Sequence, residues 1–338
     1  MTSLNAKRAE LEPAADRALA RDAILVLGSS RSGTTWLAKI LDSHPDVIYR
    51  HEPDEYLPPV PGRDSRAQIQ AWIDARELRV ATKKPFFQKS WQSLPLAMLR
   101  QTLAATLTGV SRLPIGGPAL APALARVRVP DFAARGRRSP MRAVLKLVNW
   151  DGTAALRDLS EARCIFILRH PCGQISSVMA GAAQRHLRPR DGQSDVLFDV
   201  AAVESFAGSH GVPPDEFRAL PLTARYAWDW VLFNFQMVKT LRQHVNARIV
   251  LYEDLCARPE TVVRELFRFA GLTWNKQTEG FIASSTRHAG GSGYFDVYRS
   301  SAASAERWRQ TMSPEDQDQV RSVVRRFPIA RHWPDLLD

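Results

Sequence analysis

The sequence predicts an α/β fold: a doubly wound, mainly parallel sheet flanked by helices, with loop and helical insertions that form a cap. Two observations lead to this prediction. Short apolar or β-branched runs alternate with segments of helical periodicity, and the first apolar run ends in a glycine-rich turn before a helix. In such a sheet, ligands bind beyond the carboxyl ends of the strands.

The expected strands are short and apolar, as strands covered on both faces of a sheet are. In chain order they are Ile24–Leu27, Val47–Tyr49, Ala143–Val148, Cys164–Leu168 and Arg248–Leu251. Most of them are followed by an expected helix, and these helices are Thr34–Asp42, Thr153–Asp158, Gly173–Ala182, Thr223–His244 and Pro259–Ala270.

A chain of 338 residues is long enough for one large α/β domain or for two ordinary domains. We expect a single domain over residues 23–338, after an N-terminal extension of residues 1–22. Two insertions interrupt the alternation of strands and helices, at about 57–140 and 188–221. Both contain Pro and Gly, and neither shows an internal repeat, so we interpret them as parts of a cap.

Composition indicates a folded protein, because 45% of the residues are hydrophobic and 24% are charged. The three cysteines are an odd number without metal-ligand spacing, which argues against a disulfide framework and favours a reducing compartment. The first 22 residues lack the apolar core of a signal peptide, and no apolar run approaches the length of a membrane span. We therefore expect a cytoplasmic protein.

The net charge of +11 favours anionic partners such as a nucleotide, an acidic glycan or an anionic lipid. Between Leu78 and Pro130 there is no Asp or Glu, and cations continue to Arg142. Two interpretations of this basic stretch stay open. It forms either a solvated or domain-packed helical surface, or a lid that meets an anionic acceptor or a membrane surface peripherally. Nucleic acid is not expected, because no recognition module accompanies the cations.

The first turn has the spacing of a phosphate-binding loop, Gly28-x-x-x-x-Gly33. Backbone N–H groups of such a turn, backed by a helix N-terminus, bind phosphate whatever the side chains are. The hydroxyl groups of Ser32, Thr34 and Thr35 add donors. The lysine of nucleotide-hydrolysing loops is missing and the cation of the loop is Arg31, which argues against ATP or GTP hydrolysis.

A second segment, CIFILRHPCGQISS, places Arg169 at the end of an apolar strand and Ser177 eight residues later in the next helix. This spacing allows a guanidinium and a hydroxyl group to converge on one anion near a helix N-terminus. The alternative is an ordinary turn whose arginine caps the edge of the sheet.

Taken together, these segments resemble the sulfotransferases that use 3′-phosphoadenosine 5′-phosphosulfate (PAPS). The string from Arg31 to Trp36 resembles their 5′-phosphosulfate loop, in which carbohydrate and tyrosylprotein members commonly have Arg at the position of Arg31. The segment of Arg169 and Ser177 resembles the one that holds the donor's 3′-phosphate. The resemblance therefore implies a P-loop NTPase-like fold, PAPS as co-substrate, 3′-phosphoadenosine 5′-phosphate (PAP) as product and no required metal.

Two later segments carry the resemblance further. RIVLYEDLCARPETVVRELFRFAGL is similar to a scaffold strand and helix of the family, and VYRSSAASAERWRQTMSPEDQDQV is similar to the C-terminal part of carbohydrate sulfotransferases. In the second segment, Arg299 either reaches the donor's 3′ end or is a surface residue. Trp36 either stacks on adenine or packs in the core. The insertions match no family.

The resemblance also suggests how the sulfuryl group is transferred. Arg31 and the loop amides would stabilise the charge that develops on the departing 5′-phosphate, and Lys146 would contact the transferring group, as its counterpart in the family does. A general base should help to deprotonate the acceptor hydroxyl. Cytosolic members use a His after a Lys on the middle strand, but the chain has Val148 there, followed by Asn149.

The predicted general base is Glu52 in YRHEPDEYLP, because tyrosylprotein and some carbohydrate sulfotransferases resemble this segment and place their catalytic Glu there. The alternative is that Glu52 only forms an ion pair with a neighbouring cation. His51 is the second candidate base. Adjacent strand residues point to opposite faces, so we expect that His51 and Glu52 do not both face the site.

The predicted function is transfer of a sulfuryl group from PAPS to an acceptor hydroxyl, with a carbohydrate or glycolipid as first choice of acceptor. Two other functions stay open. One is a P-loop kinase that acts on a small molecule, and the other is a non-catalytic protein that binds polyanions.

Overall fold

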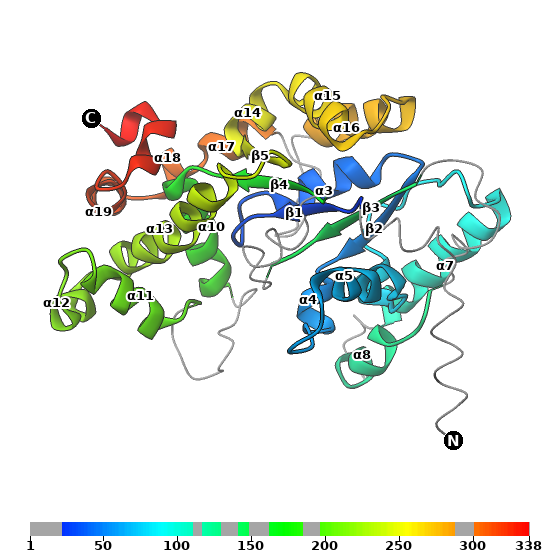
Figure 1. Cartoon of the computed structure of the whole chain (residues 1–338), viewed down its shortest axis with the longest axis horizontal. Helices are drawn as coiled ribbons and strands as arrows, with labels where there is room; N and C mark the ends of the chain where they lie inside the picture. Colours follow the sequence, from blue (N-terminus) through cyan, green and yellow to red (C-terminus); the bar gives the residue numbers. More distant parts are fainter. Residues whose placement is uncertain are drawn as a thin grey trace. The chain divides into compact units, whose positions relative to one another are not determined.

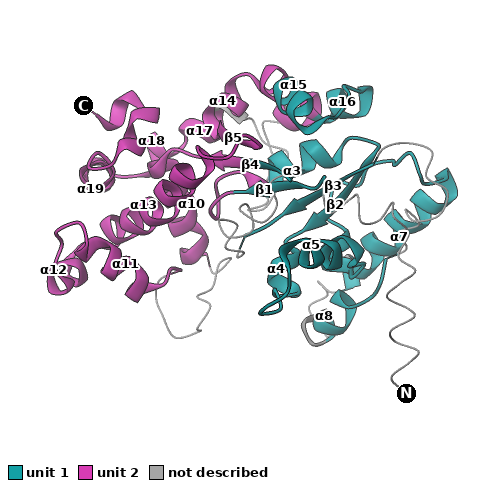
Figure 2. Cartoon of the chain, viewed as in Figure 1, with its two compact units in different colours: residues 1–27, 35–165, 263–281 teal, residues 28–34, 166–262, 282–338 magenta. Residues whose placement is uncertain are grey.

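The computed structural model describes residues 22–110, 117–129, 141–148, 162–184, 197–287 and 301–337 (Figure 1). The chain forms two compact units, which have different colours in Figure 2. Unit 1 comprises residues 1–27, 35–165 and 263–281, and unit 2 comprises residues 28–34, 166–262 and 282–338. The glycine-rich loop and Thr34, the first residue of the following helix, thus belong to unit 2. The remaining residues of that helix belong to unit 1.

The sheet has five strands in the order β2-β3-β1-β4-β5. Their bounds are β1 Ile24–Leu27, β2 Val47–His51, β3 Arg142–Lys146, β4 Arg163–Leu168 and β5 Ala247–Leu251. Strand β3 pairs in parallel with both β1 and β2. Parallel neighbours need crossover connections, which the helices between them supply. The predicted α/β fold, a parallel sheet flanked by helices, is confirmed.

All five predicted strands are present, and the differences lie at their ends. Strand β2 continues beyond the predicted end at Tyr49, because Arg50 and His51 pair with the last two residues of β3. These two residues are polar, so a prediction that follows the apolar residues places the end of the strand too early. Strand β3 ends at Lys146 instead of the predicted Val148.

Unit 1 contains helices as well as strands. The helices are α3 Thr34–Asp42, α4 Pro53–Tyr56, α5 Ser65–Asp74, α6 Leu78–Ala81, α7 Leu94–Val110 and α8 Gly117–Ala125. The bounds of α3 agree with the prediction. Helices α5 and α6 pack against β2, and α8 contacts both α6 and α7. Parts of α15 (Pro259–Ala270) and α16 (Lys276–Arg287) also belong to unit 1.

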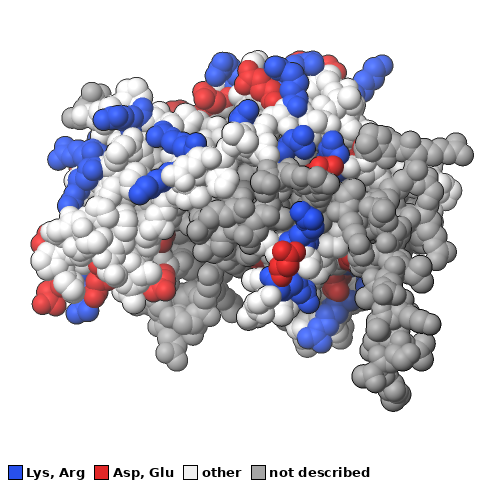
Figure 3. All heavy atoms as spheres, viewed as in Figure 1, with Lys and Arg blue, Asp and Glu red and all other residues white. Residues whose placement is uncertain are grey.

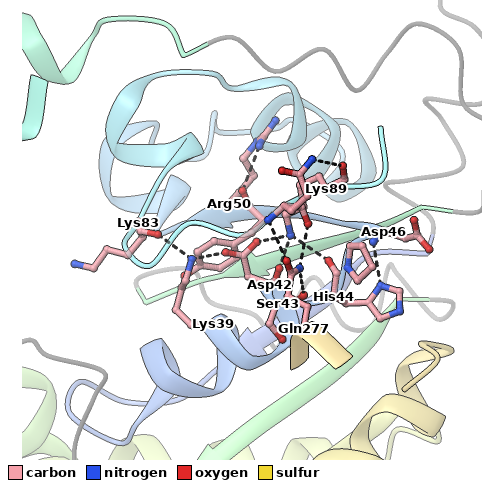
Figure 4. A network of polar contacts seen from close by, with 12 residues as sticks. Lys39, Asp42, Ser43, His44, Asp46, Arg50, Lys83, Lys89 and Gln277 are labelled. Atoms are coloured by element: carbon pink, nitrogen blue, oxygen red, sulfur yellow. Dashed lines mark hydrogen bonds and ion pairs between the residues drawn. The ribbon is translucent and has the colours of Figure 1, made fainter. Parts of the chain in front are cut away.

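A buried polar network at the end of α3 anchors the basic stretch (Figure 4). Lys39 contacts the Asp42 carboxylate and donates to the Lys83 carbonyl oxygen at 2.8 Å. Lys89 donates to Asp42 Oδ1 at 2.9 Å and to the His44 carbonyl oxygen at 3.1 Å. Lys89 is only 4% exposed, so this cation is part of the interior and not of a solvated surface.

Unit 2 is mostly helical. Its helices are α10 Pro171–Ala183, α11 Val200–Gly208, α12 Pro214–Ala219, α13 Leu222–Leu241, α14 Tyr252–Ala257, α17 Ser301–Glu306, α18 Trp308–Thr311 and α19 Pro314–Val324, followed by 3-10 turns at Pro328–His332 and Pro334–Leu336. The long helix α13 packs against α10, α11, α19 and β5. The predicted helices Gly173–Ala182 and Thr223–His244 correspond to α10 and α13.

Some predictions fall outside the described residues. They are the helix Thr153–Asp158 and almost all of the N-terminal extension of residues 1–22. The two insertions contain α5 to α8 and α11 to α12, respectively. A single domain with a cap stays a prediction. Among the described residues, no helix is long and apolar enough to cross a membrane.

Candidate active site

The glycine-rich loop of unit 2 has no room for side chains at its two glycines. A Cβ atom at Gly28 would lie 2.7 Å from Ser32 Oγ and 2.8 Å from the Ile167 carbonyl oxygen. At Gly33, where φ is +101°, a Cβ atom would lie 2.6 Å from the ring of Tyr252. Both positions therefore require glycine. The bare backbone of such a loop can approach a bound anion closely with its N–H groups.

Three predicted site residues meet beside this loop. The Arg31 Nε atom donates to Ser177 Oγ at 3.1 Å, and Arg169 Nη1 donates to the Arg31 carbonyl oxygen at 2.9 Å. Arg31 has a left-handed backbone with φ of 67°, a conformation that is uncommon outside glycine and clusters at functional sites. The loop, the end of β4 and helix α10 thus bring the Arg31 guanidinium to the Ser177 hydroxyl group and the Arg169 guanidinium to the loop backbone.

The other residues of the loop segment are more buried. The Ser32 hydroxyl donates to the Ser29 carbonyl oxygen at 2.7 Å, which stabilises the turn. Thr34 is the first residue of α3 and is 5% exposed, and Thr35 is half-buried. Trp36 is 9% exposed, which favours core packing over stacking on adenine. Arg299 lies outside the described residues.

Two contacts of Arg169 were missed by the sequence analysis. The guanidinium carbon of Arg169 lies 4.5 Å from the ring centroid of Tyr252, a cation–π distance. Arg169 Nη2 also donates to the Ser304 carbonyl oxygen in α17 at 3.2 Å. Tyr252 follows β5 directly, at the carboxyl end of a parallel-sheet strand, and this position was the signal that could have identified it.

In unit 1, Glu52 and Lys146 form an ion pair through Glu52 Oε1 and Lys146 Nζ. The pairing of His51 with Lys146 ends β2 and β3 at the same edge, and the Glu52 N–H donates to the Lys146 carbonyl oxygen at 2.8 Å. The Lys146 side chain is 3% exposed and that of Glu52 is 20% exposed. The ion pair that we considered as the alternative role of Glu52 is therefore present.

The expectation that His51 and Glu52 do not both face the site used the alternation of side chains in a strand, but these two side chains lie close together. His51 Nε2 lies 3.5 Å from Glu52 Oε2. The reason is the backbone: Glu52 has φ of 50° and ψ of 48°, a left-handed conformation that ends the strand before α4. The alternation of strand side chains no longer applies at such a residue.

A third residue, Tyr49, extends this contact. Tyr49 Oη lies 2.8 Å from His51 Nδ1, and both side chains are buried. Burial raises the pKa of Tyr49 well above its ordinary value, so its hydroxyl group stays protonated and can donate to Nδ1. The proton of a neutral His51 then resides on Nε2, where it faces the Glu52 carboxylate.

The electrostatics of the group support this assignment. Burial lowers the pKa of His51 to about 3; the Glu52 carboxylate opposes this shift, and Lys146, Lys83 and Lys39 add to it. Burial by itself would raise the pKa of Glu52, but Lys146 and His51 outweigh it and lower the pKa to about 2. At neutral pH the group therefore contains a carboxylate, a neutral imidazole and a nearby ammonium group.

A family model described as the sulfotransferase domain matches residues 21–328, which is most of the chain. The chain belongs to the sulfotransferase family. The prediction that it is an enzyme of this family is therefore confirmed, and membership favours sulfuryl transfer over a small-molecule kinase. Among the described residues, no group of three or more His, Cys, Asp or Glu is placed to hold a metal ion.

Individual relatives of this sulfotransferase are distant. Human carbohydrate sulfotransferase 3 is 37% identical over 65 residues, which make up 19% of this chain and 14% of that protein. The sulfotransferase domain from the curacin biosynthetic pathway is 16% identical, with 89% of this chain and 96% of that chain covered and a TM-score of 0.42. A mouse sulfotransferase complexed with PAP is 14% identical, with 92% and 88% covered and a TM-score of 0.41.

The burial of His51 predicts a pH dependence of stability. The unfolded chain binds a proton at His51 below about pH 6.5, whereas the folded enzyme does so only near pH 3. The unfolded state therefore binds more protons, and stability falls as the pH falls through this window. From pH 6.5 to pH 5 we expect a loss of about 2 kcal/mol at this site.

Urea unfolding at pH 6.5 and pH 5 would measure this loss. His51→Gln should show a smaller decrease than the wild type between the two pH values, whatever its stability at pH 6.5. The pKa shifts of the other histidines are the same in both proteins, so their effects on the free energy of unfolding cancel in the comparison. Parallel decreases for the two proteins would contradict a neutral, buried His51.

Proposed function

We propose that the enzyme transfers the sulfuryl group of PAPS to a hydroxyl group of an acceptor. The observation that carries the proposal is the meeting of Arg31, Arg169 and Ser177 beside the glycine-rich loop. Two guanidinium groups, a hydroxyl group and a loop without room for Cβ atoms suit a ligand with several anionic groups. A donor with a phosphosulfate and a separate phosphate is such a ligand.

In the proposed mechanism, Arg31 and the loop amides stabilise negative charge on the departing 5′-phosphate. Arg169 and Ser177 hold the 3′-phosphate. Lys146 contacts the transferring group, and Glu52 accepts the proton of the acceptor hydroxyl. The loop supplies its own cations and donors, so no metal is required for donor binding.

The observed ion pair has a consequence for this mechanism. A carboxylate with a pKa of about 2 is ionised but weakly basic. Lys146 is the strongest of the groups that lower this pKa. If Lys146 turns to the transferring group when the donor binds, the pKa of Glu52 rises and the carboxylate becomes a better base. We propose that Lys146 exchanges partners in this way.

We propose a carbohydrate or glycolipid as acceptor. Support comes from the similarity to human carbohydrate sulfotransferase 3 over 65 residues and from Arg31 in the loop. The match covers 14% of that protein, so its acceptor specificity is carried over only as a proposal.

We also propose that helices α7 and α8, part of the basic stretch, contact an anionic lipid surface. Helix α7 has small side chains inside and large ones outside: Ala104 is fully buried, whereas Leu94, Met98 and Leu99 are 65%, 60% and 55% exposed. Every exposed residue of α7 is uncharged. Leu120 of α8 is 50% exposed. An uncharged outer face combined with neighbouring cations and no acidic residue is typical of a membrane-surface helix.

The cations of this stretch are not all available for such a contact. Lys89 is buried in the network of unit 1, and Arg100 donates to the Ala81 carbonyl oxygen at 2.8 Å. Lys84, Arg126 and Arg128 are exposed. On the face seen in Figure 3, the Lys and Arg side chains of the described residues lie among acidic and uncharged ones. A lipid contact would therefore depend on the apolar side chains as well as on charge.

The proposed donor site predicts a selective effect of Arg169→Ala. A hydrogen bond to a charged group is worth about 1.5–3 kcal/mol, so PAP binding should weaken about ten- to a hundredfold. Adenosine 5′-phosphosulfate lacks the 3′-phosphate, so its binding should change much less. Calorimetry in EDTA would measure both affinities and would also show whether a metal is needed. Arg258→Ala, a change of the exposed arginine that follows α14, is the control. Equal losses for both ligands would remove Arg169 from the 3′-phosphate site.

The proposed base predicts a large effect of Glu52→Gln on turnover. The glutamine keeps size and still accepts a hydrogen bond from Lys146, but it cannot take the proton of the acceptor. We expect kcat to fall about two to four orders of magnitude, with PAP affinity near that of the wild type. Glu279→Gln, the same change at an exposed glutamate of α16, should cost much less. A Glu52→Gln enzyme with more than about a tenth of the wild-type kcat would exclude Glu52 as base.

The proposed lipid contact predicts vesicle binding that depends on α7. The wild type should sediment with phosphatidylcholine vesicles that contain about one third phosphatidylglycerol, and high salt should weaken this binding. The double change Leu94→Ser and Met98→Ser should abolish it, as should Lys84→Glu with Arg126→Glu. Val245→Ser changes an exposed apolar residue of unit 2 and is the control. Binding unaffected by these α7 changes, or concentration-dependent self-association through α7, would contradict the proposal.

A further inference from the structure

The contact between Tyr49, His51 and Glu52 has no part in the roles proposed so far. Tyr49 is 4% exposed and His51 is 6% exposed, although both carry polar groups. The distance from Tyr49 Oη to His51 Nδ1 is 2.8 Å, and that from His51 Nε2 to Glu52 Oε2 is 3.5 Å. The second distance is long for a hydrogen bond, but catalytic hydrogen bonds are often long before the ligands are bound.

We infer that His51 is a positioning residue for Glu52, and that Tyr49 fixes the tautomer of His51 that this role needs. The inference rests on the proposed role of Glu52 as general base. The phenol of Tyr49 donates to Nδ1, which leaves the imidazole proton on Nε2, the ring nitrogen that lies 3.5 Å from Oε2 of the carboxylate. With the opposite tautomer, the lone pair of Nε2 would face the negative charge of Glu52.

The two oxygen atoms of the carboxylate have different partners. Oε1 accepts from Lys146, and Oε2 faces His51. If Lys146 turns to the transferring group during the reaction, His51 and the Glu55 side chain, which shares a hydrogen bond with Glu52, are the contacts that still hold the carboxylate. A holding group is needed here, because Glu52 sits at the point where β2 ends in a left-handed turn. Misplacement of a catalytic group by about 1 Å can reduce the rate a hundredfold.

The same geometry argues against His51 as the base itself. Its Nδ1 atom is occupied by Tyr49, and its Nε2 atom carries the proton. A neutral imidazole is also the better partner for a base, since its N–H group orients the carboxylate without the full charge of an imidazolium ion. The strong burial of His51 favours this neutral form.

A double-mutant cycle tests the inference. For His51→Ala we expect kcat to fall about ten- to a hundredfold, the value of a hydrogen bond to a charged group, while the acceptor KM and PAP affinity change little. His51→Gln should recover part of the loss, because its amide can donate to Glu52. Tyr49→Phe should cost about three- to tenfold. In the Glu52→Gln background, His51→Ala should lower kcat less than about threefold, because the carboxylate that His51 positions is no longer present.

The control is His44→Ala, the loss of another buried histidine of unit 1, which contacts Thr273 Oγ1 at 3.3 Å. This change should lower thermal stability but leave kcat and its response to Glu52→Gln unchanged. If His51→Ala does not fold, Tyr49→Phe and His51→Gln still test the inference, because each removes or replaces a single hydrogen-bonding group. Equal kcat values for the wild type and Tyr49→Phe would contradict the tautomer role.

The kinetic results distinguish failure of the proposed base from failure of the positioning role. A nearly active Glu52→Gln enzyme would overturn the proposed base, and with it the positioning of that base. An inactive Glu52→Gln enzyme, combined with losses from His51→Ala and Glu52→Gln that multiply, would leave the base in place and overturn only the inference. A His51→Ala enzyme as slow as Glu52→Gln, without recovery in His51→Gln, would identify His51 as the base.

Discussion

The pairing of β2 with β3 is the interaction on which the candidate catalytic group depends. It places His51 opposite Lys146, ends both strands at one edge and allows the Glu52 N–H to donate to the Lys146 carbonyl oxygen. The chain then turns through a left-handed residue into α4. A shift of this register by one residue would move the side chains of β2 to the opposite face and separate Glu52 from Lys146. Backbone hydrogen bonds therefore determine the geometry of the ion pair.

In unit 2 the corresponding constraint is the lack of space around the loop. Gly28 lies against the Ile167 carbonyl oxygen, and Gly33 lies against Tyr252. The same tyrosine contacts the guanidinium of Arg169, whose Nη1 atom in turn donates to the Arg31 carbonyl oxygen. The ring of Tyr252 thus restricts both the space available to the loop backbone and the position of the Arg169 side chain. A cation that stacks on a ring and donates to a carbonyl group is already oriented before an anion binds, which lowers the entropic cost of binding.

Sequence patterns predicted the fold and the approach of Arg169 to Ser177 near a helix N-terminus, but not the contacts that Arg31 makes with both residues. They did not predict the side on which His51 lies. That prediction used the alternation of side chains in a strand, and no local pattern marks Glu52 as a left-handed residue. Nor does composition separate Lys89 from Lys84: the first is buried among carbonyl and carboxylate oxygens, whereas the second is exposed.

The chemistry of Glu52 depends on a balance between its two neighbours. Lys146 is charged and lowers the pKa of Glu52 strongly, so it opposes the basicity that proton transfer needs. His51 is neutral and can hold the carboxylate with a smaller effect on its charge. In the proposed mechanism, the general base must be ionised before the donor binds and more basic after the donor has bound. Both conditions are met if Lys146 moves away from the carboxylate while His51 remains in contact with it. The buried Tyr49 favours this division, because its hydrogen bond to Nδ1 leaves the proton of a neutral imidazole on Nε2, the nitrogen nearer to Glu52.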